Sequence, residues 1–193
     1  MTTLYLLRHG ETVDNTAHIL QGQTDGCLTA AGIAQVEAAA RAIAAMSDDL
    51  RPERIISSDQ GRCRHTAQIV ASHLPLPITY DPLLRERDWG SLTGHPIAEA
   101  QALHGQFPPD VETTAQMSAR TLQFMRWATT TYPEARLLIV THGLYARCLQ
   151  ATYRRLPIGD IARMANAECR RLDIDSALLP STIKSEESGA AAN

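Results

Sequence analysis

The chain has 193 residues, a length that suits one domain with a substantial buried core. Apolar residues make up 44% of it and charged residues 20%, as in ordinary soluble globular proteins. The net charge is -3, so no overall basic field favours nucleic acid or an anionic membrane. No apolar run approaches the ~18 residues that a membrane span needs. Any anionic ligand must therefore be held by a local cluster of positive groups.

The first apolar run, residues 3–7, predicts a buried strand that ends at Arg8-His9-Gly10. Residues 14–28 are polar and rich in glycine, which predicts a loop. Thr29 can cap a helix whose apolar residues recur at helical spacing up to position 43. Residues 52–57 predict a second strand, and Ser58 or Asp59 can cap a helix that runs from there to about residue 72.

Residues 77–80 predict a third, short strand, and the mixed segment 81–111 contains one weak helical pattern at 97–103. A helix is predicted from residue 112 to about 131, and another over about 144–153. Between them, residues 136–141 give the clearest strand pattern. Residues 169–174 alternate polar and apolar, as an edge strand does, and residues 181–193 predict a disordered tail.

Alternating strands and helices predict a single α/β domain over residues 1–180, with three α/β/α layers around a mostly parallel central sheet. Ligands of such sheets bind outside the carboxyl ends of the strands. Polar signals follow three of the predicted strands at this position. They are Arg8-His9-Gly10, Ser57-Ser58-Asp59 with Arg62, and Thr141-His142-Gly143.

Two histidines and two arginines converging on one cleft suit a phosphate dianion. The planar guanidinium binds two phosphate oxygens at once, and one such charge pair at ~4 Å gives on the order of 4 kcal/mol before desolvation at an effective dielectric of about 20. A neutral imidazole is a capable nucleophile near pH 7, and a second, cationic imidazole beside the bound dianion could stabilise its charge. The glycine after each histidine lets the backbone approach a ligand closely.

Simpler readings exist for each residue alone. One histidine at a strand end is more often a hydrogen-bonded structural residue than a catalyst, and Arg62 alone would more often be a solvated charge on a helix. Two His-Gly pairs, each ending an apolar run near an arginine, favour a functional site.

The motifs also resemble a known family. Their order and spacing, over about residues 3–173, are similar to those of the histidine phosphatase superfamily, the phosphoglycerate mutase-like group. The matching segments are Arg8-His9-Gly10-Glu11-Thr12 with Asn15, Ser58-Asp59 with Arg62 and Thr66-Ala67, Leu84-Arg85-Glu86, and Val140-Thr141-His142-Gly143.

This resemblance implies the phosphoglycerate mutase-like fold and a role for each residue. His9 would be the phosphorylated histidine, and Arg8, Arg62 and His142 would complete the phosphate pocket. Glu86 would protonate the leaving oxygen and later activate water. The groups implied to line the same pocket are Asn15, Gln21, Gly22 and Gly143.

Two further points stay open at the level of sequence. Glu86 could equally form an ion pair with Arg85 or Arg87. Glu112 and Arg120 match a weaker pattern of the family, in which Val111 and Thr113 stand in place of a glycine and a serine.

Segment 84–94 resembles the mutase branch of the family, whose members usually continue with a lysine and paired arginines that grip a second acidic group. Residues 88–119 contain neither Lys nor Arg, and His95 stands near the expected lysine position. We therefore predict a histidine acid-type phosphatase that cleaves small phosphomonoesters through a phosphohistidine. The alternatives are phosphoglycerate mutase-type transfer and an inactive phosphate-binding relative.

Other chemistries find less support. The remaining histidines are scattered without metal-ligand spacing, so we predict neither a metal nor another cofactor. Cys148 and Arg154 match Cys-x5-Arg, but no glycines lie between them, so Cys148 is predicted to be a buried packing residue.

The predicted partner is a small phosphorylated metabolite, with no nucleic acid or membrane, and homodimer formation stays open. Four cysteines without Cys-x-x-Cys, and no signal peptide, predict a cytoplasmic protein.

Overall fold

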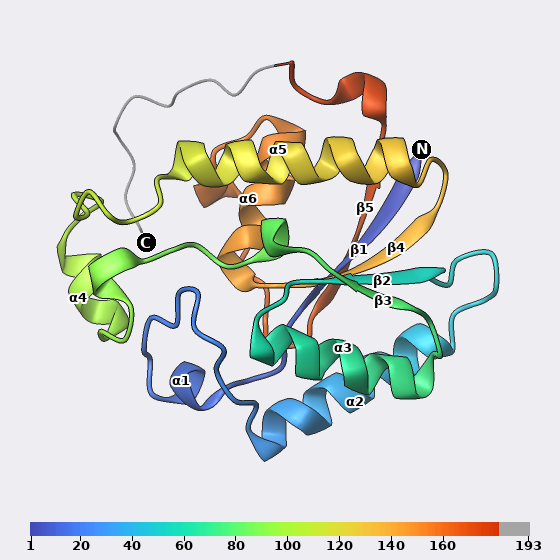
Figure 1. The fold of residues 1–193 in the computed structure, drawn as a ribbon, viewed down its shortest axis with the longest axis horizontal. Helices are drawn as coiled ribbons and strands as arrows, with labels where there is room; N and C mark the ends of the chain where they lie inside the picture. The colour runs from blue at the N-terminus through green and yellow to red at the C-terminus, as the bar shows by residue number, and fades with distance from the viewer. Residues whose placement is uncertain (182–193) are drawn as a thin grey trace.

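The structure is a computed structural model, and it describes residues 1–181. A five-stranded sheet in the order β3-β2-β4-β1-β5 forms its middle layer (Figure 1). Strands β1 to β4 run parallel, and β5 pairs with β1 antiparallel at one edge. The predicted α/β class and the edge strand are therefore confirmed. The strands are β1 (Thr2–Arg8), β2 (Arg54–Ser57), β3 (Ile78–Tyr80), β4 (Arg136–Thr141) and β5 (Cys169–Ile174).

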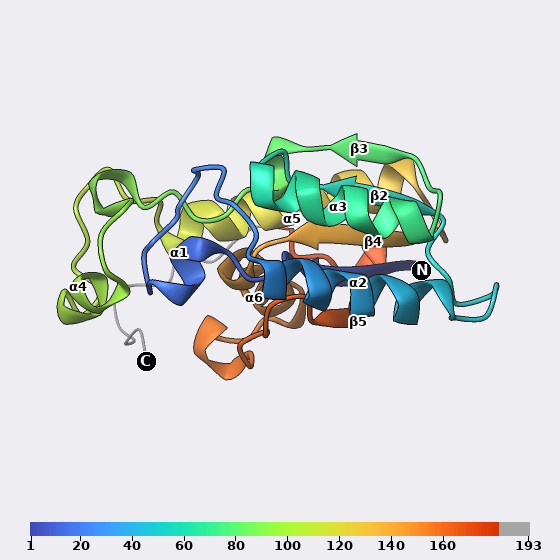
Figure 2. The same ribbon diagram turned by 90° about the horizontal axis from the view of Figure 1, so that it is seen from below.

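Helices cover both faces of this sheet. α2 (Ala30–Ala44) and α3 (Gly61–His73) lie on one face, and α5 (Thr114–Thr131) and α6 (Gly143–Arg154) lie on the other (Figures 1 and 2). Successive residues of β1 alternate between two cores, because side chains of a strand point to opposite faces. Leu4 and Leu6 pack with α5 and α6, whereas Tyr5 and Leu7 pack with α2 and α3. This is the predicted three-layer arrangement.

The caps of the helices agree only in part with the sequence patterns. Thr29 caps α2 by accepting a hydrogen bond from the Gly32 amide at 2.9 Å, as predicted. The predicted start of α5 at residue 112 is wrong, because Thr113 forms a capping box with Gln116 and the helix begins after it. The predicted caps of α3 are also wrong: Gln60 occupies the N-cap position, and its side chain makes no capping bond.

The predicted loop 14–28 contains one helical turn, α1 (Val13–Thr16). Thr12 accepts from the Asn15 amide and Asn15 Oδ1 accepts from the Thr12 amide, so a capping box stabilises a turn too short to show periodicity. The weak helical pattern farther on is confirmed as α4 (Ile97–Ala102). Both views place α1 and α4 beyond the same end of the sheet, where β1 leads into the first loop (Figures 1 and 2).

Residues 89–111, which carry α4, form an excursion that pairs with residues 18–20 and whose two ends meet at a closed neck. Asp88 and Glu112 form that neck: the Glu112 amide donates to the Asp88 carbonyl at 2.8 Å, and the Asp88 amide donates to Glu112 Oε2 at 3.1 Å. The guanidinium of Arg87 lies between Trp89 and Phe107, 4.5 and 4.7 Å from their ring centroids. Arg87 thus packs against both the first and the last part of the excursion.

Of the predicted tail 181–193, only Ser181 is described, and the rest lies outside the described residues. In the part of the chain that the structure describes, no helix has the length and apolar character needed to cross a membrane. All four cysteines are free. Cys148 is 1% exposed in the core between α5, α6 and the sheet, which confirms its predicted packing role.

Candidate active site

His9 and His142 follow two neighbouring strands in the middle of the sheet. β1 and β4 are in register, with Arg8 opposite Thr141, and the His9 amide extends the ladder to the Thr141 carbonyl at 3.0 Å. Each histidine therefore leaves the sheet at the same level. Their ring centroids are 5.3 Å apart with planes at 63°, and both residues are buried.

The surroundings of His9 define which ring nitrogen is available. Nδ1 lies 2.7 Å from the Gly10 carbonyl, which can only accept, so Nδ1 carries the proton and Nε2 keeps its lone pair. Burial, followed by the charges of Arg62 and Arg8, lowers the pKa of His9 well below 6.5. A neutral imidazole with a free Nε2 is the form that can attack phosphorus.

Arg62, on the first turn of α3, is 1% exposed and turns back to the loop formed by residues 21–26. It donates to the carbonyl of Gly22 at 2.9 Å and to the carbonyl of Thr24. Burial lowers its pKa, whereas Glu86 is among the negative groups that oppose the shift. Its Nε is buried with no hydrogen-bond partner among residues 1–181. A buried cation with a spare donor fits an anionic ligand, because an unmade charged hydrogen bond is costly.

Arg8, next to His9 in the chain, has the same character. It donates to the Met164 carbonyl at 2.7 Å, and its Nε is likewise buried without a partner within the described chain. Its side chain lies against Gly143, where an added Cβ would stand 3.1 Å from Nε. The absence of a side chain at position 143 thus leaves room for the guanidinium at the beginning of α6.

His142 contacts side chains from the segment between β2 and α3 and from α3. Its Nε2 lies 3.0 Å from the hydroxyl of Ser58 and 3.4 Å from the thiol of Cys63. Burial, then Arg62 and His9, lower its pKa well below 6.5. The imidazole is therefore neutral at pH 7, and the cationic form expected from the sequence requires a bound dianion to favour it.

The other residues predicted to line the pocket differ in what they contact. Gly22 adopts φ 52° and turns its carbonyl to Arg62, a backbone conformation that favours glycine. Gln21 is buried, and its Oε1 has no partner among the described residues. Asn15 uses its side-chain oxygen within α1 and accepts a bond from Asn166, which also donates to the His9 carbonyl at 3.2 Å.

The carboxylate of Glu86 binds the N-terminus of α6. Its oxygens accept from the amides of Leu144 at 3.2 Å and Tyr145 at 3.1 Å, and from the amide of Arg87 at 2.9 Å. Backbone N–H groups at a helix N-terminus favour an anion, which explains the orientation. The alternative in which Glu86 forms an ion pair with Arg85 or Arg87 is wrong. Arg85 binds Asp59 through two hydrogen bonds, and the Arg87 guanidinium lies between two aromatic rings and donates to the Glu112 carbonyl.

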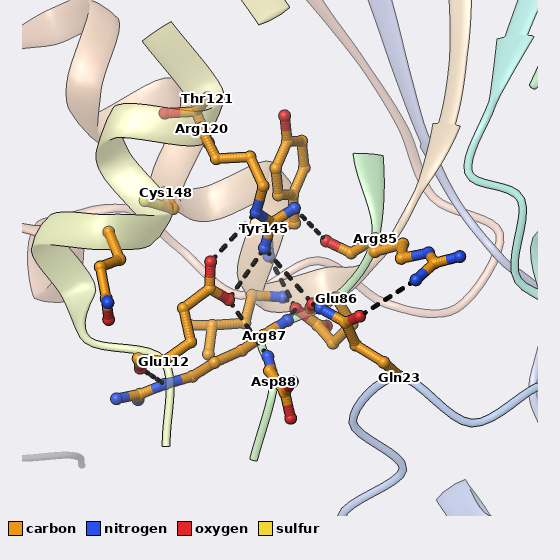
Figure 3. A network of polar contacts seen from close by, with 12 residues as sticks. Gln23, Arg85, Glu86, Arg87, Asp88, Glu112, Arg120, Thr121, Tyr145 and Cys148 are labelled. Atoms are coloured by element: carbon orange, nitrogen blue, oxygen red, sulfur yellow. Dashed lines mark hydrogen bonds and ion pairs between the residues drawn. The ribbon is translucent and has the colours of Figure 1, made fainter. Parts of the chain in front are cut away.

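An ion pair on α5 supports the chain around Glu86. Figure 3 shows Arg120 reaching from its helix to this segment, with Glu112 beside it. Arg120 donates to both Glu112 oxygens, at 3.0 and 2.9 Å, and to the carbonyls of Leu83, Arg85 and Glu86 at 2.7, 2.6 and 3.4 Å. Both partners are mostly buried, and their bonds hold the backbone that carries Glu86.

Sequence reasoning missed three side-chain contacts with these residues. Ser58 was predicted at the ligand end of the sheet and as a possible helix cap, and its hydroxyl contacts His142. Asn166 donates to the His9 carbonyl, and Gln60 accepts from the Glu86 amide. No periodic pattern marks such positions. Only the place of Ser58 and Gln60 between a strand and a helix, at the ligand end of the sheet, offered a signal. Among residues 1–181, no group of three or more His, Cys, Asp or Glu residues could hold a metal ion.

The arrangement can therefore hold a phosphoryl group between Arg8, Arg62 and two imidazoles, with a carboxylate on the neighbouring helix N-terminus. Residues 4–178 match the sequence model of the histidine phosphatase superfamily (branch 1). The chain belongs to this superfamily, whose members carry out phosphoryl transfer. The fold expected from the resemblance is confirmed by solved members of the group.

Relatives with assigned names fall on both sides of the mutase–phosphatase divide. The probable phosphoglycerate mutase GpmB of Citrobacter koseri is 33% identical over 187 residues, covering 91% of this chain and 85% of its own. Among solved structures, Bacillus stearothermophilus YhfR is 25% identical with a TM-score of 0.82, covering 97% of this chain and 98% of its own. A mycobacterial glucosyl-3-phosphoglycerate phosphatase in complex with VO3 is 27% identical with a TM-score of 0.78, covering 89% and 92%.

Proposed function

We propose that this member of the histidine phosphatase superfamily hydrolyses small phosphomonoesters through a phosphohistidine at His9. The observation that carries the proposal is the state of His9: a neutral ring whose Nδ1 is bound to the Gly10 carbonyl and whose charge state is set by burial and two arginines. Arg8 and Arg62 neutralise the dianion that the neutral nucleophile attacks.

In the first step, His9 Nε2 forms a bond to phosphorus while the bond from phosphorus to the ester oxygen breaks. Glu86, in its protonated form, gives its proton to that oxygen, so the alcohol leaves neutral. In the second step, the Glu86 carboxylate takes a proton from water. The water oxygen bonds to phosphorus, the N–P bond breaks, and inorganic phosphate is released with His9 restored.

Transfer of the phosphoryl group to water, and not to a second position of a sugar acid, is favoured because the arginines around Glu86 already have partners within the protein. Arg85 is bound to Asp59, and Arg120 is bound to Glu112. Arg87 is held between two aromatic rings, with Nε donating to the Glu112 carbonyl at 2.7 Å. Since residues 88–119 supply no further Lys or Arg, the leaving-group side offers little to hold a carboxylate or a second phosphate.

Phosphoglycerate mutase-type transfer is the second candidate, and the names of the curated relatives support it. The two are separated by giving the purified chain 3-phosphoglycerate and measuring both 2-phosphoglycerate and released phosphate. A panel of sugar, nucleotide and alkyl phosphomonoesters and p-nitrophenyl phosphate is measured in parallel. We expect phosphate release to dominate and to depend on His9.

Efficient interconversion with negligible phosphate release would instead establish the mutase. Absence of turnover on every compound, with inorganic phosphate still bound, would establish an inactive phosphate-binding relative. The His9→Asn variant is the background control for each assay, because asparagine keeps a polar side chain but cannot form the phosphohistidine.

A further inference from the structure

Gln60 stands between the two halves of the candidate site. It is 3% exposed and occupies the N-cap position of α3, two residues before Arg62. Side chains at N-cap positions usually accept a bond from the helix's own amides. Here Asp25 serves α3 in that way: its carboxylate accepts from the Gly61 amide and its carbonyl accepts from the Arg62 amide, both at 2.9 Å. The Gln60 side chain is therefore available for contacts outside the helix.

All the polar atoms of the Gln60 amide are used in those contacts. Its nitrogen donates to the carbonyls of Gly22 at 3.1 Å and Thr24 at 3.0 Å, and its oxygen accepts from the Glu86 amide at 2.9 Å. A primary amide supplies two donors and an acceptor without charge, which matches two carbonyls and one N–H. Gln60 thus links the 21–26 loop, which Arg62 also binds, to the residue that carries the acid.

The two ends of this link differ in what else supports them. Arg62 also binds the carbonyls of Gly22 and Thr24, so the 21–26 loop keeps a partner if Gln60 is lost. The Glu86 amide has only Gln60 as a partner in the described chain. The other direct link, from Gln23 Nε2 to the Glu86 carbonyl, is longer at 3.3 Å. Loss of the Gln60 amide should therefore disturb Glu86 more than the phosphate pocket.

We propose that Gln60 is a positioning residue that holds the backbone of Glu86 at a fixed place relative to the 21–26 loop, and so aligns proton delivery to the leaving oxygen. The inference rests on the proposed role of Glu86 as the acid. It concerns a residue outside the motifs that carry the family resemblance. Small misplacements of a catalytic group cost rate steeply, since proton transfer needs hydrogen-bond contact.

Leaving-group dependence measures proton delivery directly. The values of kcat/KM are compared for p-nitrophenyl phosphate, phenyl phosphate and a primary alkyl phosphate, because only poor leaving groups need protonation. Gln60→Met keeps the length of the side chain and removes the amide. We expect its kcat/KM to fall about tenfold on the alkyl phosphate and by no more than about twofold on p-nitrophenyl phosphate. Inhibition by inorganic phosphate should stay within about twofold of the unmodified chain.

Gln60→Glu provides the complementary variant. A carboxylate keeps the acceptor for the Glu86 amide but loses both donors and adds negative charge near Arg62. The leaving-group dependence should then stay close to that of the unmodified chain while inorganic phosphate inhibits more weakly. Gln68→Met, the same substitution at an exposed position of α3, should change neither quantity.

Glu86→Gln is the reference that separates the two proposals. If its dependence on the leaving group is no steeper than that of the unmodified chain, Glu86 is not the acid, and both proposals fall. The positioning role is overturned, and Glu86 remains the acid, if the dependence of kcat/KM on the leaving group is steep in Glu86→Gln but not in Gln60→Met. This includes the case in which Gln60→Met lowers kcat/KM equally for all three substrates. The proposal also requires that the double variant Gln60→Met, Glu86→Gln depends on the leaving group no more steeply than Glu86→Gln alone.

Discussion

The ring of His142 meets the ring of His9 edge to face, with centroids 5.3 Å apart, and burial and Arg62 lower the pKa of both well below 6.5. Above pH 6.5 the unfolded chain also holds these rings neutral, so they do not alter stability. Below pH 6.5, the two rings bind protons in the unfolded chain but stay neutral in the folded chain. The free energy of unfolding should then fall by about 1.4 kcal/mol per pH unit per ring, until the lowered pKa values are reached.

Urea unfolding at pH 7.5 and pH 5 measures this loss. His9→Asn removes one of the two rings and should show a smaller loss between the two pH values than the unmodified chain. His65→Asn, at an exposed position of α3, should leave the loss unchanged. Equal losses in all three proteins would mean that the buried rings do not resist protonation.

Glu86→Gln should also expose the covalent intermediate. Glutamine cannot take a proton from water, so the second step slows, whereas p-nitrophenyl phosphate needs little help in the first step. Rapid mixing should give a burst of nitrophenol of about one equivalent, followed by slow turnover. Acid-labile phosphate should appear on the protein and be absent in His9→Asn. A burst without protein-bound phosphate would argue against the phosphohistidine.

Arg120→Met should destabilise the fold and lower activity together. It leaves the Glu112 carboxylate mostly buried without its partner and removes donors from three carbonyls of the segment that carries Glu86. Breaking a fully buried pair by removing one partner costs about 3–5 kcal/mol, and we expect a smaller loss here, because the Arg120 and Glu112 side chains keep 16% and 13% of their exposure. The double variant Arg120→Met, Glu112→Gln removes the uncompensated charge, so chemical denaturation should show it to be more stable than the single variant. A single variant as stable as the parent would contradict this account.

Gly32→Ala tests how closely α2 approaches the loop after His9. A glycine inside a helix normally costs about 1 kcal/mol relative to alanine, so the substitution should stabilise an unconstrained helix. Here the added Cβ would stand 2.1 Å from the Glu11 carbonyl, a backbone atom that cannot give way without moving the catalytic loop. We expect a loss of about 2 kcal/mol or more in thermal or urea unfolding. Gly159→Ala, with no atom within 4 Å of its added Cβ, should be neutral and is the control.

The positions of His9, His142 and Arg62 could be predicted because each depends on local rules. Apolar runs end at the two histidines, and parallel strands bring their carboxyl ends together. The state of Glu86 could not be predicted from its neighbours in sequence. Its carboxylate is satisfied by the first amides of α6, more than fifty residues away, and nothing near residue 86 specifies that contact.

The missed contacts share the same cause. Asn166 reaches His9 across 157 positions, and Ser58 reaches His142 across 84, so their roles exist only after the sheet has assembled. The wrong caps of α3 have a related reason. Ser58 and Asp59 are good capping residues by type, but a neighbouring histidine and Arg85 bind them more favourably, and Asp25 from another segment caps the helix.

The closed neck between Asp88 and Glu112 has a consequence for how such a protein can diversify. A segment whose two ends are tied together can lengthen, shorten or change its composition without altering the spacing of the residues below it. Glu86 lies just outside the neck on one side, and Arg120 holds it from the other. Residues 94–97, however, also pair with residues 18–20, which lead into the loop that Arg62 binds. The substitutions and length changes that the neck permits are therefore confined to the parts of residues 89–111 outside that pairing. A segment exchanged at residues 88 and 112 to change selectivity would therefore have to keep its pairing with residues 18–20.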